Sequence, residues 1–186
     1  MACLCLLIIS LTMRIFKREH HNKIHKALNY FDTDFFQKHH IIFGGGTRIA
    51  MEIDEYRESV DIDIICPTVS AYKAARSEIS ANSLGKLVKK EFNYQREIKA
   101  DRYAARTFIN IDNNPIKVEI ISFADYRLSS IINPDVFPIP YLDTTSCYIT
   151  KLLANADRSL QPPFKDIIDI IVLYLTWGSI PEKAWA

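Results

Sequence analysis

The sequence has few of the residues that mark flexible linkers or cysteine-based metal sites. Its 186 residues include only 5 glycines and 8 prolines, so we expect one compact domain with at most a small appendage. The 4 cysteines, Cys3, Cys5, Cys66 and Cys147, form no CxxC pair. This spacing argues against structural zinc and indicates reduced thiols in an intracellular protein. There is no internal repeat and no low-complexity segment.

The sequence also lacks an excess of charge of either sign. Lys and Arg number 23 against 22 for Asp and Glu, so no overall field directs the protein toward nucleic acid or anionic lipid. Such a partner would need a local patch. Apolar residues at 48% and charged residues at 24% are close to the averages of globular proteins, which argues against a disordered or fibrous chain.

A long hydrophobic run is absent as well. Residues 2–11 are almost entirely apolar, but this run is about half of the ~20 residues that span a bilayer. No basic residue precedes it, and no small-residue cleavage site follows. Because Met13 opens an amphipathic segment, we interpret residues 1–12 as an upstream extension of the true start, in preference to a membrane or export segment. We therefore expect a cytoplasmic protein with no membrane partner.

The hydrophobic pattern predicts both helices and strands. Apolar residues recur at helical spacing over 15–37, where one or two amphipathic helices are expected. A short strand over 40–43 leads to three glycines, and Thr47 can cap a brief helix that ends before Tyr56. Residues 60–65 alternate between apolar and acidic side chains, as in a strand. Residues 69–92 look helical.

The second half of the sequence predicts a hairpin and two helices. Strands over 103–111 and 116–121 flank the turn sequence Asp112-Asn113-Asn114-Pro115. A proline-interrupted stretch over 133–140 precedes helices over 144–156 and 164–177. The fold class is therefore α+β: a small mixed or antiparallel sheet with flanking helices and a C-terminal helical pair. We expect residues 13–142 to form the core and residues 143–186 a helical part packed on it.

Two carboxylates stand on one face of the predicted 60–65 strand. Asp61 and Asp63 are separated by two positions, so their side chains point the same way. If both are buried they repel each other, unless a cation lies between them. Mg²⁺ is typically held by one or two carboxylates together with substrate phosphates. The alternative is the solvent-exposed face of an edge strand.

The segment before these aspartates contains Gly44-Gly45-Gly46-Thr47 between a strand and a helix start. Backbone N–H groups at such a turn can approach a phosphate without obstruction by side chains. The spacing fits neither GxxxxGK[ST] nor GxGxxG, which disfavours a P-loop ATPase and a dinucleotide-binding fold. Taken alone, the segment could equally be a structural turn.

Taken together, Gly45-Gly46-Thr47 and the later Asp61-Ile62-Asp63 resemble the first motif of the DNA polymerase beta-like nucleotidyltransferase superfamily. Within it, GGTRIA followed by Arg57-Glu58-Ser59-Val60-Asp61-Ile62-Asp63 is most similar to the AbiE-type (AbiEii-like) nucleotidyltransferase toxins. The direct match covers about twenty residues, and weaker similarity extends over most of 41–175. Arg57 and Ser59 match the motif too, and they either orient the carboxylates or hold a turn.

The resemblance implies further site residues. A third acidic residue on a neighbouring strand corresponds to Glu119, where aspartate is more usual; the alternative is a surface glutamate paired with a lysine. A helical lysine, an Asp-Arg pair and a basic-Asp-x-x-Asp helix start correspond to Lys151, Asp157-Arg158 and Lys165-Asp166-Ile167-Ile168-Asp169. Lys151 would be a mobile positive charge against the triphosphate, and Asp166 would orient the acceptor or the lysine. Otherwise these are a solvated lysine and first-turn acids favoured by the helix dipole.

The resemblance implies metal-binding, nucleotide-binding and catalytic roles. The expected metal ligands, for Mg²⁺ or alternatively Mn²⁺, are Asp61, Asp63 and Glu119. The expected nucleotide-binding residues are Gly45, Gly46, Thr47 and Ser59. The expected catalytic residues are Asp61, Asp63, Lys151 and Asp166.

The implied activity is metal-dependent transfer of an NMP group from an NTP to tRNA or protein, by a toxin controlled by a cognate antitoxin. Two alternatives stay open: a non-catalytic nucleotide- or RNA-binding remnant of the fold, and a small-molecule nucleotidyltransferase of the antibiotic-modifying kind. Basic residues are frequent over 86–106, where a solvated surface or RNA phosphate contacts are possible. The five histidines show no convergent pattern.

Overall fold

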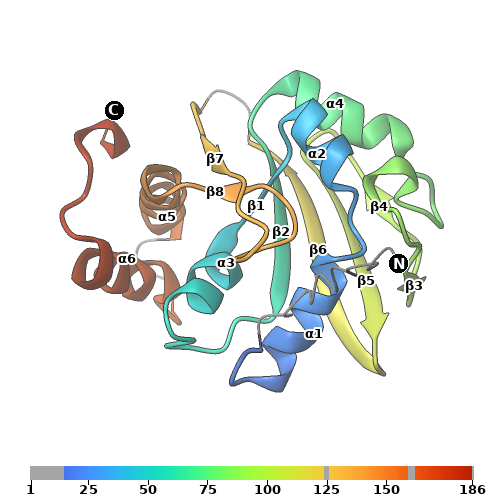
Figure 1. The fold of residues 1–186 in the computed structure, drawn as a ribbon. Coiled ribbons are helices and arrows are strands. Elements are labelled where there is room, and N and C mark those ends of the chain that lie inside the picture. Colours follow the sequence, from blue (N-terminus) through green and yellow to red (C-terminus); the bar gives the residue numbers. More distant parts are fainter. Residues whose placement is uncertain (1–14, 124–125, 159–161, 186) are drawn as a thin grey trace, which may run out of the picture.

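The structure is a computed structural model that describes residues 15–123, 126–158 and 162–185. Helices cover both faces of one mixed sheet (Figure 1). The helices are α1 Glu19–Leu28, α2 Thr33–His39, α3 Gly45–Glu52, α4 Val69–Glu78, α5 Thr144–Arg158 and α6 Lys165–Trp177, with short 3-10 turns η1 Gly85–Leu87 and η2 Glu182–Ala184. The strands are β1 Ile42–Gly44, β2 Asp61–Cys66, β3 Asn93–Tyr94, β4 Lys99–Ala100, β5 Ala104–Ile111, β6 Asn114–Ser122, β7 Ser130–Ile131 and β8 Tyr141–Leu142.

The strands lie in the order β3-β5-β6-β2-β1-β8-β7, and β4 also pairs with β5. The pairs β2–β6 and β1–β8 are parallel, and the others are antiparallel. Two apolar clusters hold the layers together. One lies between the sheet and α1, α2 and α4, and the other lies between the sheet and α3, α5 and α6. The predicted α+β class with a mixed sheet and a C-terminal helical pair is confirmed.

Most of the predicted elements are present, with ends that shift by a few residues. The hairpin between β5 and β6 forms, but its loop is only Asp112-Asn113, both with positive φ (50° and 62°), and Asn114 already pairs with Ile111. Positive φ at both central positions is typical of the tight turns that match the twist of hairpin strands. The predicted turn was therefore two residues too long.

The predicted helix over 69–92 is wrong beyond Glu78. The chain leaves α4 at Ile79 in an extended conformation and folds back through Gly85, whose φ is +58°. A Cβ atom at Gly85 would lie 2.4 Å from the carbonyl oxygen of Glu78, so this close return of the chain requires glycine. The following residues then supply β3 and β4, which the hydrophobic pattern did not reveal.

Helix α3 is fixed to both the sheet and α6 through Arg48. The Arg48 side chain is buried, and its guanidinium carbon lies 5.1 Å from the ring centre of Tyr141 and 5.0 Å from that of Trp177. Such cation–π contacts are worth more when the charge is desolvated. Arg48 also forms an ion pair with Glu52 one turn later. The orientation of α3 relative to the sheet is thus set by buried contacts.

The predictions for residues 1–12 and for Cys3 and Cys5 lie outside the described residues. Cys66 and Cys147 are free and buried, and burial raises the pKa of their thiols to about 12 and about 11. Within the described part of the chain, no helix is long and apolar enough to cross a membrane.

Candidate active site

Strand β2 presents its two aspartates on one face of the sheet. Ile62 and Ile64 are fully buried on the opposite face, against the cluster under α1, α2 and α4. Asp61 and Asp63 are half-buried on the face that α3, α5 and α6 cover in part, where Ile65 is buried with α3 and α5. In register, Asp63 lies beside Gly44 of β1 on one side and beside Glu119 of β6 on the other. The alternation predicted from the sequence is therefore the observed one.

The glycines at the start of α3 lie directly against these acidic groups. Gly45 has φ +71°, and a Cβ atom there would lie 1.9 Å from Oδ2 of Asp63. A Cβ atom on Gly46 would lie 2.1 Å from a terminal nitrogen of Arg57. Side chains at either position would therefore displace the groups that face the helix start. The first turn of a helix leaves N–H groups without intrahelical partners, and they point toward this end.

Thr47 does not cap the helix, contrary to the prediction. Helix α3 begins at Gly45 with Gly44 as the N-cap, so Thr47 is already inside the first turn. Its side chain is buried, and its hydroxyl donates a hydrogen bond to Oγ of Ser59 at 2.8 Å. Thr47 thus ties the helix start to the loop before β2.

Six of the predicted site residues line one pocket of about 340 Å³. They are Gly46, Ser59, Asp61, Asp63, Lys151 and Asp166. The other lining residues are Arg57, Glu58, Val60, Arg158 and Lys165. Gly45, Thr47 and Glu119 lie outside the lining. A larger cavity of about 680 Å³ between the start of α5 and Lys183 contains none of the predicted residues, so the smaller, more charged pocket is the candidate site.

Asp61 and Asp63 differ from the other acidic groups of the site in lacking an ion-pair partner within the described ranges. Among the described residues, no lysine, arginine or histidine forms an ion pair with either carboxylate. Burial, together with the nearby charges of Asp61 and Glu119, raises the pKa of Asp63 to about 6. An excess of negative charge in a half-buried site is the condition that a bound cation would relieve.

Glu119 differs from these two aspartates because it already has cationic partners. Lys117 Nζ lies 2.7 Å from one carboxylate oxygen, and Arg106 Nε lies 3.0 Å from the other. The pairing with a lysine is the one that the alternative interpretation of Glu119 expected. Within the described residues, no three carboxylate, imidazole or thiol groups converge closely enough to hold a metal ion by themselves.

Lys151 is a fixed charge, not the mobile one that the sequence led us to expect. It is buried, and its Nζ lies 2.9 Å from Asp166 and 2.7 Å from Asp169. Asp169 is fully buried and also accepts two hydrogen bonds from Arg57, at 2.7 and 2.9 Å, and one from Tyr56. Burial opposes ionisation of Asp169, but the hydrogen bond from Arg57 and the charge of Lys151 outweigh it, so the pKa lies below its usual range.

Sequence reasoning did not assign roles to Asp169 and Lys165. Asp169 is the centre of the network that joins α6, α5 and the loop before β2. The sequence feature that could have identified Asp169 is its three-residue spacing from Asp166, which places both carboxylates on one face of α6. Lys165 lines the pocket and, among the described residues, forms no ion pair, unlike Lys151. It is therefore a cation available to an incoming anion.

The basic stretch over 86–106 is divided among local partners. Lys86 pairs with Glu78 at 3.3 Å, and the guanidinium of Arg96 lies 4.3 Å from the ring centre of Phe108. Among the basic residues of this stretch whose contacts are described, only Arg106 pairs with one of the predicted metal ligands, Glu119. These contacts leave the RNA-binding prediction untested.

Solved structures are similar to this one. JHP933 from Helicobacter pylori is 13% identical, with 88% of this chain and 69% of that chain covered and a TM-score of 0.51. ANT(2")-Ia, solved in complex with adenylyl-2"-tobramycin, is 12% identical, with 87% of this chain and 91% of that chain covered and a TM-score of 0.46. No curated protein matches the chain significantly.

The paired aspartates that face a glycine-led helix are the arrangement that the nucleotidyltransferase resemblance led us to expect. A family model described as "Nucleotidyl transferase AbiEii toxin, Type IV TA system" matches residues 27–186. The chain belongs to this family, which confirms the resemblance seen in the glycine and aspartate motifs.

Proposed function

We propose that this protein is the toxin of a toxin–antitoxin pair and that it transfers an NMP group from an NTP to a hydroxyl group of tRNA or protein, with the help of Mg²⁺ or Mn²⁺. One observation carries the proposal. Asp61 and Asp63 lie side by side, with no ion-pair partner among the described residues, against the glycine start of α3 and in one pocket with Lys151 and Asp166. Membership of the family supports nucleotidyl transfer and a cognate antitoxin as partner.

The donor set fits a divalent cation. Asp61 and Asp63 would supply two carboxylate ligands, and burial together with the charges of Asp61 and Glu119 raises the pKa of Asp63. Two carboxylates completed by phosphate oxygens and water are a usual arrangement for Mg²⁺. When bound, the ion would polarise the phosphates and neutralise charge that develops during transfer. Glu119 could join only after exchanging its contacts with Lys117 or Arg106.

The protein's own groups would then bind and orient the nucleotide. The first-turn N–H groups of α3, at Gly45, Gly46 and Thr47, would receive terminal phosphate oxygens. Ser59 would add a hydroxyl at the same wall of the pocket. Lys165, which lines the pocket without an ion pair, would attract the departing pyrophosphate.

The remaining roles concern the fixed charges and the acceptor. Lys151 would act as a fixed positive charge, oriented by Asp166. Glu119 lies beside Asp63 on the face of the sheet that α3, α5 and α6 cover in part. We expect the acceptor hydroxyl to approach beside Glu119. Its carboxylate could accept the hydroxyl proton as a general base. The attack would be in line on the α-phosphorus, with pyrophosphate as the leaving group.

The test is transfer of label. The purified protein is incubated with each of the four α-labelled NTPs, Mg²⁺ or Mn²⁺, and total RNA or total protein. Label in RNA or protein supports the proposal, and the parallel NTP reactions identify the preferred base. Label only in a small molecule would indicate an antibiotic-type enzyme, and no label under any condition would indicate a non-catalytic remnant. The control is Asp63→Asn, which should abolish transfer while the protein remains folded.

A further inference from the structure

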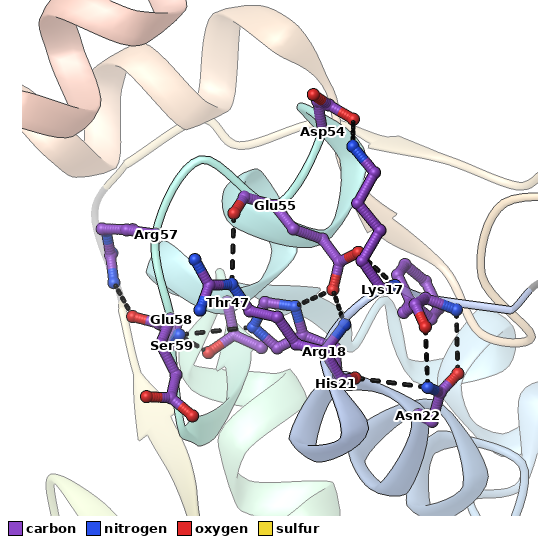
Figure 2. A network of polar contacts seen from close by, with 11 residues as sticks. Lys17, Arg18, His21, Asn22, Thr47, Asp54, Glu55, Arg57, Glu58 and Ser59 are labelled. Carbon is purple, nitrogen blue, oxygen red and sulfur yellow. Dashed lines mark hydrogen bonds and ion pairs between the residues drawn. The ribbon is translucent and has the colours of Figure 1, made fainter.

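His21 connects the first described helix to the wall of the pocket. The imidazole is fully buried on α1, with Nδ1 2.7 Å from Oε1 of Glu55 and Nε2 3.3 Å from the backbone nitrogen of Ser59. Figure 2 shows these contacts converging between α1 and the loop that precedes β2. No residue of this group was assigned a function from the sequence except Ser59.

The partners of His21 determine its tautomer. The backbone N–H of Ser59 can only donate, so Nε2 must carry the lone pair. The Nδ1 atom then carries the proton and donates it to Glu55, which accepts as a carboxylate. Each ring nitrogen therefore has one defined role, and the neutral imidazole bridges Glu55 and Ser59.

Glu55 is itself held in a fixed orientation. It has a left-handed backbone conformation with φ +54°, and its carboxylate accepts hydrogen bonds from the backbone N–H groups of Lys17 and Arg18 at the start of α1. Arg18 Nε in turn donates to the backbone oxygen of Glu55 at 3.2 Å. The loop after α3 and the start of α1 thus lock each other, and His21 is oriented between them.

Ser59 connects His21 to the first turn of α3 and to the start of β2. Its hydroxyl accepts a hydrogen bond from Thr47 in the first turn of α3, and it lies two residues before Asp61 in β2. The family model begins at residue 27, so Ser59 lies within the matched part of the chain and His21 lies outside it.

We propose that His21 is a positioning residue that, through Ser59, holds the α3 start and the β2 start at the spacing that nucleotide binding requires. The inference rests on the proposed function, because the pocket is taken to bind an NTP. His21 does not itself line the pocket. Its effect should therefore appear mainly as weaker NTP binding, with a smaller change in the rate of transfer from bound NTP.

Two variants test separately the hydrogen bond of His21 with Ser59 and the one with Glu55. In His21→Gln, the side-chain amide can place an oxygen near the position of Nε2 and accept from the N–H of Ser59. In His21→Asn, the amide can occupy the position of Nδ1 and donate to Glu55, but it does not reach Ser59. The matched control is Asn22→Ala, since Asn22 anchors the same segment through two 2.8 Å hydrogen bonds with Phe16 and does not contact Ser59.

The first measurement is amide hydrogen exchange of Ser59, which needs no activity. We expect His21→Asn to accelerate this exchange about threefold to tenfold, the range of one ordinary hydrogen bond. His21→Gln should stay closer to wild type, and Asn22→Ala should leave Ser59 unchanged. Unchanged exchange in His21→Asn would overturn the inference.

The second measurement is the binding of each NTP by calorimetry with Mg²⁺, together with KM and kcat for label transfer and the melting temperature of each variant. A rise in KM in His21→Asn that exceeds the rise in Asn22→Ala, at a similar melting temperature, supports positioning. Equal changes in both variants would indicate a merely structural role and reject it. If the wild-type protein binds NTP but transfers no label, the proposed transfer fails, and the calorimetric comparison of His21→Asn with Asn22→Ala still decides whether His21 positions the pocket.

Discussion

Replacing Asp63 by asparagine should stabilise the metal-free protein while it removes transfer. The carboxyl group titrates near pH 6 in the folded protein, against 3.8 as its ordinary value. Each pKa unit corresponds to ~1.4 kcal/mol, so ionised Asp63 costs the folded state about 3 kcal/mol at pH 7. The cost is fully present above pH 6, shrinks as the pH falls toward 3.8, and vanishes below it. Asparagine has nearly the same shape and carries no charge.

We expect Asp63→Asn to raise the free energy of unfolding by about 2 kcal/mol, less than the full amount because the amide must still be desolvated. The assay is urea unfolding at pH 7 in the presence of a chelator, in which a shift of the midpoint at constant slope measures the change. Asp135→Asn, a change of the same chemistry at an exposed position, is the control and should lie within about 0.5 kcal/mol of wild type.

Bound metal should oppose this difference in stability between wild type and Asp63→Asn. Adding Mg²⁺ and an NTP should stabilise the wild-type protein by mass action and leave Asp63→Asn nearly unchanged. A variant that is less stable than wild type without metal would refute the reasoning, because it would show that the charge of Asp63 is already compensated within the protein.

Three further predictions concern the same site. Gly45→Ala should abolish transfer and destabilise the fold by at least about 1 kcal/mol, because φ is +71° and the new Cβ would overlap Asp63; thermal unfolding and label transfer would measure both effects. Lys151→Met should cost about 3 kcal/mol in chemical unfolding, because it removes a buried cation from Asp166; an unchanged midpoint would contradict this. Burial lowers the pKa of His21 below 6.5 despite the charge of Glu55, so the unfolded chain takes up this proton first as the pH falls. Stability should therefore decrease as the pH falls below 6.5, and His21→Gln should flatten that part of the profile of unfolding free energy against pH.

Local patterns in the sequence were sufficient for the long elements. The apolar spacing of α5 and α6 and the alternation in β2, β5 and β6 each reflect which face of an element is buried, and that information is contained within the element. The short strands β3, β4, β7 and β8 were not recognised, because two residues carry no periodicity and their structure depends on the strand beside them. The same limit explains the error after Glu78, where the chain turns back through Gly85.

For the candidate site too, some features follow from local sequence and others only from the tertiary structure. The sequence by itself determined that Asp61 and Asp63 share a face and that a glycine-led helix start is close to them along the chain, since both follow from strand period and local spacing. Only the tertiary structure decided which charges are compensated: Lys151 is held by Asp166 and Asp169, Glu119 by Lys117 and Arg106, while Asp61 and Asp63 have no such partner among the described residues. Partners of this kind come from elements far apart in the sequence, and electrostatic balance depends on distance in space, which no local pattern contains.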